Sequence, residues 1–297
     1  MRKKILGRDK KIKKAILPVA GFGTRFLPAT KAQPKEMLPV VDKPVIQYLV
    51  EEAVSAGIEE IIFVTGRGKR AIEDHFDISF ELEHTLVEKE KKELLDEVRK
   101  ISSLAKFSYV RQPKPLGDGH AILCAKQLIN PDETVAVLFG DDLVDSKTSA
   151  ISQLIKVYEK YEDPVIALTE VAKEDVHKFG VVDPLEVGER TYEIKKFVEK
   201  PRTEDAPSNL VAIGKYIITP YIFEKLEESV NDKGEIRLAN AFVKALKEGK
   251  PIYGYEVEGD RYDCGDKFGF LQATIQMGLK HPETKDKLKK YLKSLKF

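Results

Sequence analysis

The sequence has no tryptophan and only two cysteines, Cys124 and Cys264, in its 297 residues. Two cysteines cannot form the disulfide framework of a small secreted protein, and they do not by themselves make a metal site. Long apolar runs are also absent. The run from Ala15 to Ala20, which follows a basic N-terminus, is too short for the core of a signal peptide, and no run approaches the roughly 18 apolar residues of a membrane span. These absences predict a soluble protein of a reducing cytoplasm.

Neither sign of charge predominates. The 50 lysines and arginines nearly balance the 49 aspartates and glutamates, which argues against a protein that coats nucleic acid or an anionic membrane. Basic residues do gather at the two ends, and we expect a basic N-terminal extension over residues 1–14 and a basic C-terminal helix or tail over residues 281–297. We interpret both as solubilising segments, with oligomer contacts or weak binding of polyanions as alternatives.

Short apolar runs alternate with helical periodicity along the first half of the chain. Strands are predicted at Ala15–Val19, Glu60–Val64, Phe107–Val110 and Thr134–Phe139, and a helix at Val45–Ala56, where apolar residues recur at helical spacing. The continuously apolar strands indicate a sheet that is buried on both faces. We therefore expect an α/β fold with a Rossmann-like, doubly wound sheet that is mixed but mostly parallel and is flanked by helices.

Two other regions depart from this pattern. Residues 79–100 are highly charged, with leucine and valine at helical spacing, which predicts a solvated helical excursion. From residue 164 onward strand-like runs dominate, followed by helices near 220–228 and 238–247. No linker rich in proline, glycine or serine separates the two parts. We therefore expect a single domain over residues 15–280, whose second half, residues 164–280, forms a smaller mixed subregion beside the first, residues 15–163.

The stretch "AGFGTRFLPATKAQPKEMLP" directly follows the first predicted strand. It lacks the third glycine of a dinucleotide-binding turn, because Phe26 stands in its place, and it does not fit the phosphate-binding loop of P-loop proteins. Gly21 and Gly23 nevertheless allow backbone N–H groups to approach an anion, and Arg25 and Lys35 add positive charge. Prolines on both sides of the segment "KEML" restrict the backbone around Lys35. We interpret the stretch as a phosphate site, with an ordinary surface turn as the alternative.

The same stretch closely resembles the signature of sugar-1-phosphate nucleotidyltransferases, and most of all that of the bacterial UTP-glucose-1-phosphate uridylyltransferases. The resemblance continues in order through "VRQPKPLGDGHAILCA", "VLFGDDLV", "FGVVDP", "FVEKP", "AIGKYIITP" and "YDCGDKFGFLQA", and covers roughly residues 13–280. It implies a Mg²⁺-dependent enzyme that forms UDP-glucose and pyrophosphate from UTP and glucose 1-phosphate. It also implies a homodimer or homotetramer without nucleic-acid or membrane partners.

The resemblance implies a metal site and three catalytic cations. Asp141, which follows the apolar run "TVAVLF", is implied to bind Mg²⁺ together with the distant Asp263, although from the residues alone it fits a helix or turn cap equally well. Arg25 and Lys35 are implied to stabilise the triphosphate, and Lys200 to hold the sugar phosphate.

Contacts with the two substrates are implied in the same way. Gln112, whose planar amide offers donors and an acceptor, is implied to read uracil, and Glu199 to hydrogen-bond the hydroxyls of glucose. We interpret His120 as a structural or nucleotide-adjacent residue. The implied nucleotide-binding set is Ala20, Gly21, Gly23, Gln112 and Gly117, and the implied sugar-binding set is Asp142, Gly180, Glu199 and Gly214.

One residue departs from the family's pattern, and some alternatives stay open. Asp118 stands in "LGDGH" where many relatives have an apolar residue, and a negative charge near a triphosphate is unfavourable unless it points away or engages a metal or ribose. A thymidylyltransferase on the same scaffold is the main alternative, because uracil and thymine present the same pairing edge. A nicotinamide-dependent dehydrogenase is disfavoured by the missing glycine, and a non-catalytic relative by the presence of the charged residues named above.

Overall fold

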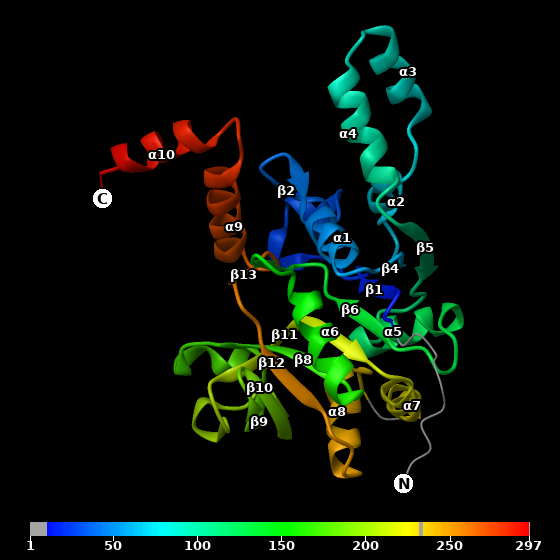
Figure 1. Cartoon of the computed structure of the whole chain (residues 1–297), viewed down its shortest axis with the longest axis vertical. Coiled ribbons are helices and arrows are strands. Elements are labelled where there is room, and N and C mark those ends of the chain that lie inside the picture. The colour runs from blue at the N-terminus through cyan, green and yellow to red at the C-terminus, as the bar shows by residue number, and fades with distance from the viewer. Residues whose placement is uncertain (1–10, 232–233, 297) are drawn as a thin grey trace.

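The computed structural model describes residues 11–231 and 234–296, so most of the predicted N-terminal extension lies outside the described residues. Helices lie on both sides of a large sheet (Figure 1). The strands are β1 (Lys14–Pro18), β2 (Pro39–Val40), β3 (Lys43–Pro44), β4 (Glu60–Thr65), β5 (Lys106–Arg111), β6 (Val135–Leu138), β7 (Asp142–Asp145), β8 (Val165–Glu170), β9 (Gly180–Gly188), β10 (Thr191–Glu199), β11 (Leu210–Ile218), β12 (Tyr253–Glu256) and β13 (Asp260–Asp263). The α-helices are α1 (Val45–Ser55), α2 (Arg70–Phe76), α3 (Phe80–Glu88), α4 (Lys92–Ser102), α5 (Asp118–Ala125), α6 (Ala150–Tyr161), α7 (Pro220–Glu228), α8 (Leu238–Lys247), α9 (Lys267–Lys280) and α10 (Lys285–Ser294). Within the described part of the chain, no helix has the length and apolar character that a membrane crossing requires.

The large sheet is mixed, and its two halves pair differently. The strand order is β5-β4-β1-β6-β11-β8-β12-β10-β9. β5, β4, β1 and β6 pair in parallel, and so do β8 and β12, whereas β10 and β11 are antiparallel to all their neighbours. The expected mixed sheet is confirmed, and its parallel order lies mainly in the half that the alternating sequence pattern predicted. In the second half, β10 and β11 make most neighbouring pairs antiparallel.

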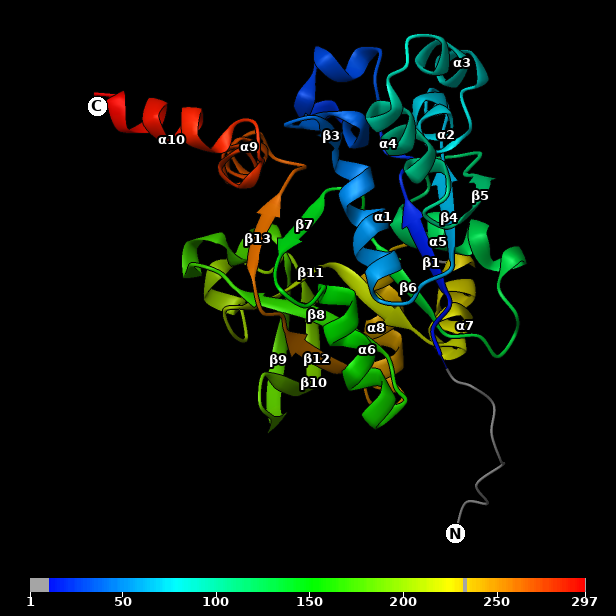
Figure 2. The ribbon, with the colours of Figure 1, turned by 45° about the horizontal axis from the view of Figure 1, so that its top comes forward.

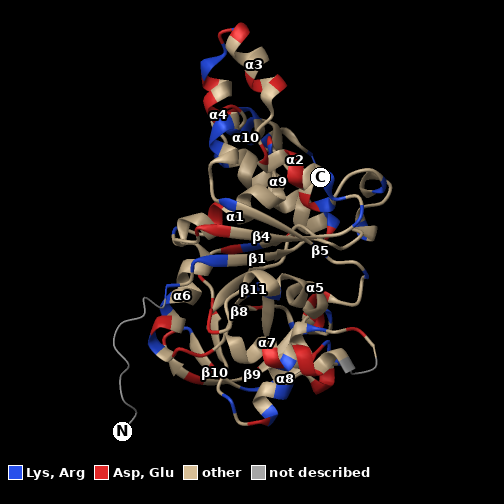
Figure 3. Ribbon diagram, turned by 90° about the vertical axis from the view of Figure 1, so that its right-hand side faces the viewer, with Lys and Arg blue, Asp and Glu red and all other residues tan. Residues whose placement is uncertain are grey.

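The core forms on both faces of this sheet. Leu17 of β1 and Phe63 of β4 pack on the face that carries α1, α2 and α6, while the adjacent residues Ile16 and Ile62 pack on the face that carries α5, α7 and α8. Successive side chains of a strand point to opposite faces, so a strand covered on both sides is apolar throughout. Figure 3 shows α1, α2 and α9 above strands β1 and β4, and α5, α7 and α8 below these strands.

The charged excursion is a helix hairpin. The prediction of helix over residues 79–100 is confirmed, but the segment turns back on itself and forms two helices, α3 and α4, which project from the body (Figure 1). Each helix buries one leucine, Leu86 in α3 and Leu95 in α4, and Arg99 donates to Glu83 across the hairpin at 2.8 Å. The predicted helices at 220–228 and 238–247 correspond to α7 and α8 with the same bounds.

A small second sheet brings distant segments to one edge of the large sheet. The parallel strands β1, β4, β5 and β6 end at the same edge, where ligands bind in open α/β sheets. Just after β6, strand β7 pairs antiparallel with β13, and the register places Asp142 opposite Asp263 (Figure 2). Residues from the middle and the end of the sequence therefore become direct neighbours beside that edge.

Candidate active site

Two adjoining pockets open at this edge. We call them the larger pocket, of about 570 Å³, and the smaller pocket, of about 370 Å³. Asp118, Phe139 and Asp141 line both. Asp141 therefore lies where the two compartments meet.

The predicted site residues divide between these pockets, with one exception. The smaller pocket is lined by Ala20, Gly21, Lys35, Gln112, Gly117 and Asp141, and the larger pocket by Arg25, Asp141, Asp142, Gly180, Glu199, Lys200, Gly214 and Asp263. Gly23 lines neither pocket. It has a left-handed φ of 66°, and a Cβ added to it would lie 3.1 Å from the Cβ of Lys35, so its role is to shape the backbone beside that lysine.

A half-buried lysine neutralises the carboxylate at the junction. Lys35, on a short 3₁₀ turn bracketed by prolines, places its Nζ 2.5 Å from Oδ2 of Asp141, and Arg25 lies 3.9 Å from the same oxygen. Burial opposes both charges. For Lys35 the attraction of Asp141 and Glu36 outweighs burial and raises its pKa, and for Asp141 the attraction of Lys35 and Arg25 outweighs burial and lowers its pKa. Both groups are therefore charged at neutral pH.

A second ion pair is buried behind the first. Glu36 Oε2 lies 2.7 Å from Nζ of Lys69, and the two side chains are only 1% and 5% exposed. Burial raises the pKa of Glu36 and lowers the pKa of Lys69, and the attraction within the pair opposes both shifts. The other oxygen, Oε1, has no hydrogen-bond partner among the described residues, and Glu36 lines the smaller pocket. Glu36 thus carries a buried acceptor without a partner in the described part of the chain, beside this pocket.

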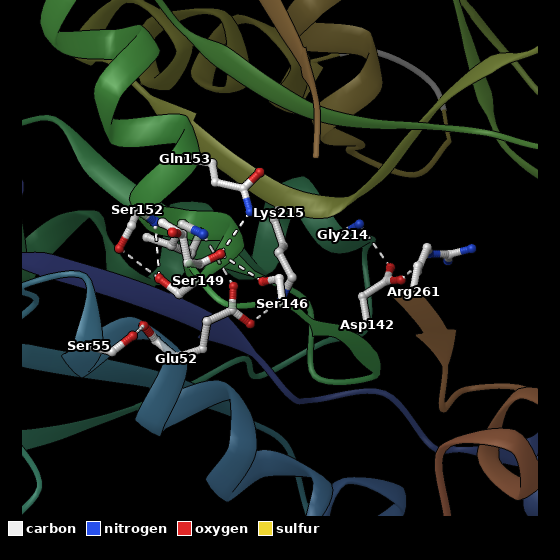
Figure 4. A network of polar contacts seen from close by, with 12 residues as sticks. Glu52, Ser55, Asp142, Ser146, Ser149, Ser152, Gln153, Gly214, Lys215 and Arg261 are labelled. Carbon is white, nitrogen blue, oxygen red and sulfur yellow. Dashed lines mark hydrogen bonds and ion pairs between the residues drawn. The ribbon is translucent and has the colours of Figure 1, made fainter. Parts of the chain in front are cut away.

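Asp142 is held by two segments that are distant in the sequence. Its Oδ2 accepts a 2.8 Å hydrogen bond from the backbone N–H of Gly214 on β11, and its Oδ1 lies 2.5 Å from Nε of Arg261 on β13 (Figure 4). A Cβ added at Gly214 would lie 2.7 Å from that Oδ2, so only glycine permits this approach. The N–H of Gly214 is used inside the protein, and Asp142 stiffens the wall of the larger pocket.

The same network continues into the core. Lys215, next to Gly214, is fully buried and lies 2.7 Å from Oε2 of Glu52 on α1. Oε1 of Glu52 accepts from the backbone N–H of Ile151 at the start of α6 (Figure 4). One carboxylate therefore ties α1, α6 and β11 together, directly behind the residues that fix Asp142.

Asp263 completes an arrangement of carboxylates that a divalent cation would suit. Its Oδ1 accepts from the N–H of Gly265 at 2.9 Å, and Arg261 lies 3.8 Å from its Oδ2. Burial, followed by the negative charges of Asp142 and Asp141, raises the pKa of Asp263. No group of three or more metal-ligating side chains occurs among the described residues. Two hard oxygen donors under mutual repulsion nevertheless fit Mg²⁺, which takes one or two carboxylates and completes its shell with water and phosphate oxygens.

The amide of Gln112 is fixed by its own loop. Its Nε2 donates to the carbonyl of Gly117 at 2.9 Å and to Nδ1 of His120 at 3.0 Å. Burial lowers the pKa of His120, which keeps the ring neutral and able to accept. Both amide hydrogens are thus used within the protein, and only Oε1 remains for a ligand. The sequence had suggested that the amide offers donors as well, which the structure corrects.

The unusual Asp118 points to a helix terminus. Its Oδ1 accepts a 2.9 Å hydrogen bond from the N–H of Leu238, the first residue of α8. Burial raises the pKa of this carboxyl, and the hydrogen bonds from the N–H groups of Leu238 and Gly119 oppose that shift. A carboxylate at a helix N-terminus is favourable. Asp118 therefore joins α5 to α8.

Glu199 and Lys200 lie at the end of β10, on the wall of the larger pocket. Lys200 has a left-handed φ of 46°, a conformation that non-glycine residues adopt at a cost and that is concentrated at functional sites. Burial, followed by the charge of Asp118, raises the pKa of Glu199. On the facing strand β9, a Cβ added at Gly180 would collide with the ring of Phe197. Glycine is therefore required for this strand pair to close beside Glu199.

Three charged residues of the site escaped the sequence analysis. Arg261 stands two positions before Asp263, and an alternating strand would have placed both on one face. Glu36 lies inside the recognised signature, next to Lys35. Lys69 belongs to "TGRGKR", which fails as a P-loop and offers no other signal. Each acts through a partner distant in the sequence, which spacing arguments do not reveal.

Known proteins are similar to this chain over nearly its whole length. The model of the nucleotidyl transferase family matches residues 14–278. The UTP–glucose-1-phosphate uridylyltransferase of Staphylococcus haemolyticus is 54% identical over 289 residues, which are 97% of this chain and 100% of that protein.

Solved structures are similar over most of their length. A crystal structure of UDP-glucose pyrophosphorylase complexed with UDP-glucose matches with a TM-score of 0.82 and 46% identity, covering 91% of this chain and all of that one. A UTP-bound UGPase from Acinetobacter baumannii matches with a TM-score of 0.89 and 41% identity, covering 96% of this chain and all of that one.

Proposed function

The chain belongs to the nucleotidyl transferase family, and we propose that it transfers the uridylyl group of UTP to glucose 1-phosphate, releasing pyrophosphate and UDP-glucose. The observation that carries this proposal is the position of Asp141, neutralised by Lys35 and Arg25, where the two pockets meet. A transfer between two substrates needs a compartment for each and charge neutralisation between them. This arrangement supplies both.

The reaction requires the protein mainly to align the two substrates and to neutralise the charge of their phosphates. A phosphate oxygen of glucose 1-phosphate attacks the α-phosphorus of UTP, the bond from that phosphorus to the β-phosphate oxygen breaks, and pyrophosphate leaves. No covalent enzyme intermediate is required. Lys200, on the wall of the larger pocket, would hold the attacking phosphate. Arg25 and Lys35 would stabilise the triphosphate and the charge that develops on the leaving pyrophosphate.

Asp141 and Asp263 would hold a divalent metal ion, which we propose to be Mg²⁺. When bound, the ion would neutralise phosphate charge and orient the reacting groups. The chain's own contribution is to keep two carboxylates close in a partly buried place. Asp263 is held in its turn by Gly265, and the backbone carbonyl of Asp141 accepts from Cys264 at 2.7 Å.

Each pocket offers groups suited to one substrate. In the smaller pocket, Oε1 of Gln112 would accept a hydrogen bond from the N3–H of uracil. Ala20, Gly21 and Gly117 would contribute backbone groups around the nucleotide.

The larger pocket would receive glucose 1-phosphate. Glu199 would hydrogen-bond the hydroxyls of the sugar, while Gly180, Gly214 and Asp142 would shape the wall. We accordingly assign the nucleotide to the half of the domain over residues 15–163, which we interpret as the Rossmann-like part, and the sugar phosphate to residues 164–280. The thiols of Cys124 and Cys264 are free, which favours a cytoplasmic location.

A nucleotide panel tests the proposal. Pyrophosphate release would be measured with glucose 1-phosphate and with UTP, dTTP, CTP, ATP or GTP as the nucleotide. We expect UTP to be used best and CTP to be rejected, because N3 of cytosine is an acceptor and would face Oε1 of Gln112. A preference for dTTP would favour a thymidylyltransferase. Absence of turnover with every nucleotide would favour a non-catalytic relative.

A further inference from the structure

Helices α5 and α8 both lie below strands β1 and β4 in Figure 3, and the segments at their N-termini are hydrogen-bonded to each other. We call residues 235–238, which lead into α8, the strap, and residues 116–120, which lead into α5, the reading loop. The N–H of Ile236 donates to the carbonyl of Leu116 at 2.8 Å, and the carbonyl of Ile236 accepts from the N–H of Gly119 at 2.9 Å. The strap and the reading loop, although distant in the sequence, are therefore joined through their backbones.

The two helices also cap each other. The first N–H groups of an α-helix have no partner within the helix. The N-cap residues here are Gly117 in α5 and Arg237 in α8, and neither has a side-chain acceptor that could serve as a cap. The carbonyl of Ile236 serves the start of α5 instead, and Oδ1 of Asp118 accepts from the N–H of Leu238 at the start of α8 at 2.9 Å. Asp118 thus supplies the side-chain cap that the N-cap residue of α8 cannot provide.

The contact between the strap and the reading loop is close at Gly117. This glycine has a left-handed φ of 112°, and a Cβ added to it would lie 2.3 Å from the carbonyl oxygen of Ile236. The carbonyl of Gly117 accepts from Nε2 of Gln112, and Nδ1 of His120 is the second acceptor for the same nitrogen. The reading loop therefore carries both groups that orient the amide of Gln112, and the strap holds that loop from behind.

The strap itself belongs to the walls of both pockets. Glu235 lines the smaller pocket, whereas Arg237 and Leu238 line the larger pocket. Glu235 and Arg237 form an ion pair of 2.8 Å across the strap. A change that loosens the strap therefore acts on the site and not only on the fold around it.

We propose that Asp118 is a positioning residue for base recognition, which locks the strap to the reading loop and thereby sets the orientation of the Gln112 amide. This inference rests on the proposed function, in which that amide reads uracil. With both amide hydrogens held by the reading loop, only Oε1 faces the base, and it suits the N3–H of uracil. In a loosened loop the amide would be free to turn over and present Nε2 to N3 of cytosine, which is an acceptor. The lock therefore favours uracil over cytosine.

Two simpler roles for Asp118 lead to different expectations. If its charge alone mattered, removing the charge would strengthen nucleotide binding, because a carboxylate repels a triphosphate. If it only stabilised α8, its loss would lower the unfolding temperature and leave the choice of base unchanged. A positioning role alone predicts a change in base preference that depends on the hydrogen-bond acceptor.

Two variants of nearly the same shape separate these roles. Asp118→Leu removes the acceptor and the charge, whereas Asp118→Asn removes the charge and keeps Oδ1. We would measure kcat/KM for UTP and CTP with glucose 1-phosphate, and Kd for both nucleotides by calorimetry. Asp118→Leu should lower the preference for UTP over CTP about tenfold, the equivalent of one hydrogen bond, and Asp118→Asn should largely keep it. The matched control is Ser149→Ala, which removes the side-chain cap of α6 outside both pockets and should leave the preference unchanged.

A double variant tests whether Asp118 acts through Gln112. Asp118→Leu should raise the KM for UTP about fivefold in the wild-type background. In the Gln112→Ala background no amide remains to be oriented, so the same substitution should have little further effect.

Hydrogen exchange tests the lock without any substrate. The amides of Gly119 and Ile236 should exchange faster in Asp118→Leu than in the wild type or in Asp118→Asn, because the strap and the reading loop then separate more often. Thermal unfolding would verify that each variant is folded, and Asp118→Ala would replace an unfolded Asp118→Leu.

Several results would overturn the proposal. They are an unchanged base preference in Asp118→Leu, an equal loss of preference in Asp118→Asn, additive effects of Asp118→Leu and Gln112→Ala, or unchanged hydrogen exchange. Absence of turnover with every nucleotide would overturn the proposed function instead. The Kd values for UTP and CTP would then decide the role of Asp118 independently of catalysis.

Discussion

The smaller and larger pockets differ in what holds their polar walls. In the smaller pocket Gln112 is fixed by His120, from the same loop and helix start. In the larger pocket Asp142 is fixed by Gly214 and Arg261, from two strands that are distant in the sequence. The contact of Gln112 with His120 is local and bears on ligand recognition alone, whereas the contacts of Asp142 also join elements of the fold. A change at Asp142 should therefore affect stability as well as binding, and a change at Gln112 mainly binding.

Lys35 lines the smaller pocket and neutralises Asp141 at the junction of the two pockets, so its loss should have the largest effect on turnover. We expect Lys35→Ala to lower kcat by about 10² to 10³-fold, because the cation that would face the triphosphate and the developing charge is removed. The variant should stay folded, because the space left by the lysine side chain adjoins a partly exposed surface. Steady-state kinetics and thermal unfolding would measure both effects. Lys43→Ala, which breaks a lysine–carboxylate pair with Glu51 outside the pockets, is the matched control. Normal turnover of folded Lys35→Ala would contradict the assignment.

Arg261→Ala should separate the two pockets most clearly. It removes the partner of Asp142 while Gly214 remains, so we expect about 2 to 3 kcal/mol of lost unfolding free energy. The KM for glucose 1-phosphate should rise about tenfold and the KM for UTP should change little, because the wall of the larger pocket alone is loosened. Chemical denaturation and kinetics with each substrate varied would test this. Arg190→Ala, whose arginine pairs with Glu256, should leave both KM values unchanged. Equal changes in the two KM values would contradict the expectation that Arg261→Ala affects the larger pocket alone.

Gln112→Ala should affect the smaller pocket alone. Loss of the acceptor Oε1 should raise the KM for UTP about tenfold, the equivalent of one hydrogen bond in a pocket, and should leave the KM for glucose 1-phosphate unchanged. The control is Gln47→Ala, because Gln47 also bonds a histidine, His75, at 2.9 Å but lines neither pocket. A rise in the KM for the sugar phosphate would show that the two pockets are not independent.

The smallest effect should be a pH dependence of nucleotide binding. Burial lowers the pKa of His120 below its ordinary value, so the ring is neutral at pH 7 and its Nδ1 accepts from Gln112. As pH falls below about 6.5, the ordinary pKa of histidine, protonation of the ring removes that acceptor and the KM for UTP should rise. The phosphates of UTP titrate in the same interval, and His120→Asn would separate the two effects. The variant should retain only the part that UTP itself contributes, and an identical pH profile would exclude His120.

Local features of this protein were predictable from local sequence. The alternating pattern predicts β1, β4, β5 and β6 to within a residue or two. For β1, β4 and β6 the reason is that strands buried on both faces are apolar over most of their length. The bounds of α7 and α8 follow equally directly from helical periodicity. The sequence predicted a single helical excursion where the structure has the hairpin of α3 and α4, because the turn between the two helices contains neither glycine nor proline.

Residues whose partners come from elsewhere in the fold were not predictable in this way. The sequence suggested that the charge of Asp118 would be unfavourable beside a triphosphate. In the structure its carboxylate accepts a hydrogen bond from the first residue of α8, which is far along the chain. Gly214 belongs to the implied sugar-binding set, and the structure shows that its N–H donates to Asp142. The buried pair of Glu36 and Lys69 left no sequence signal at all.

By itself, the sequence determined the α/β class, the strands of the first half, and the motifs that supply the candidate residues. These follow from periodicity and from residue types within short segments, which act before any tertiary contact forms. Only the tertiary structure decided that Asp141 lies between two pockets, that Asp142 faces Asp263 across β7 and β13, and that Arg261 joins them. Those positions depend on the register of strands that are distant in the chain, and side-chain chemistry alone does not specify that register.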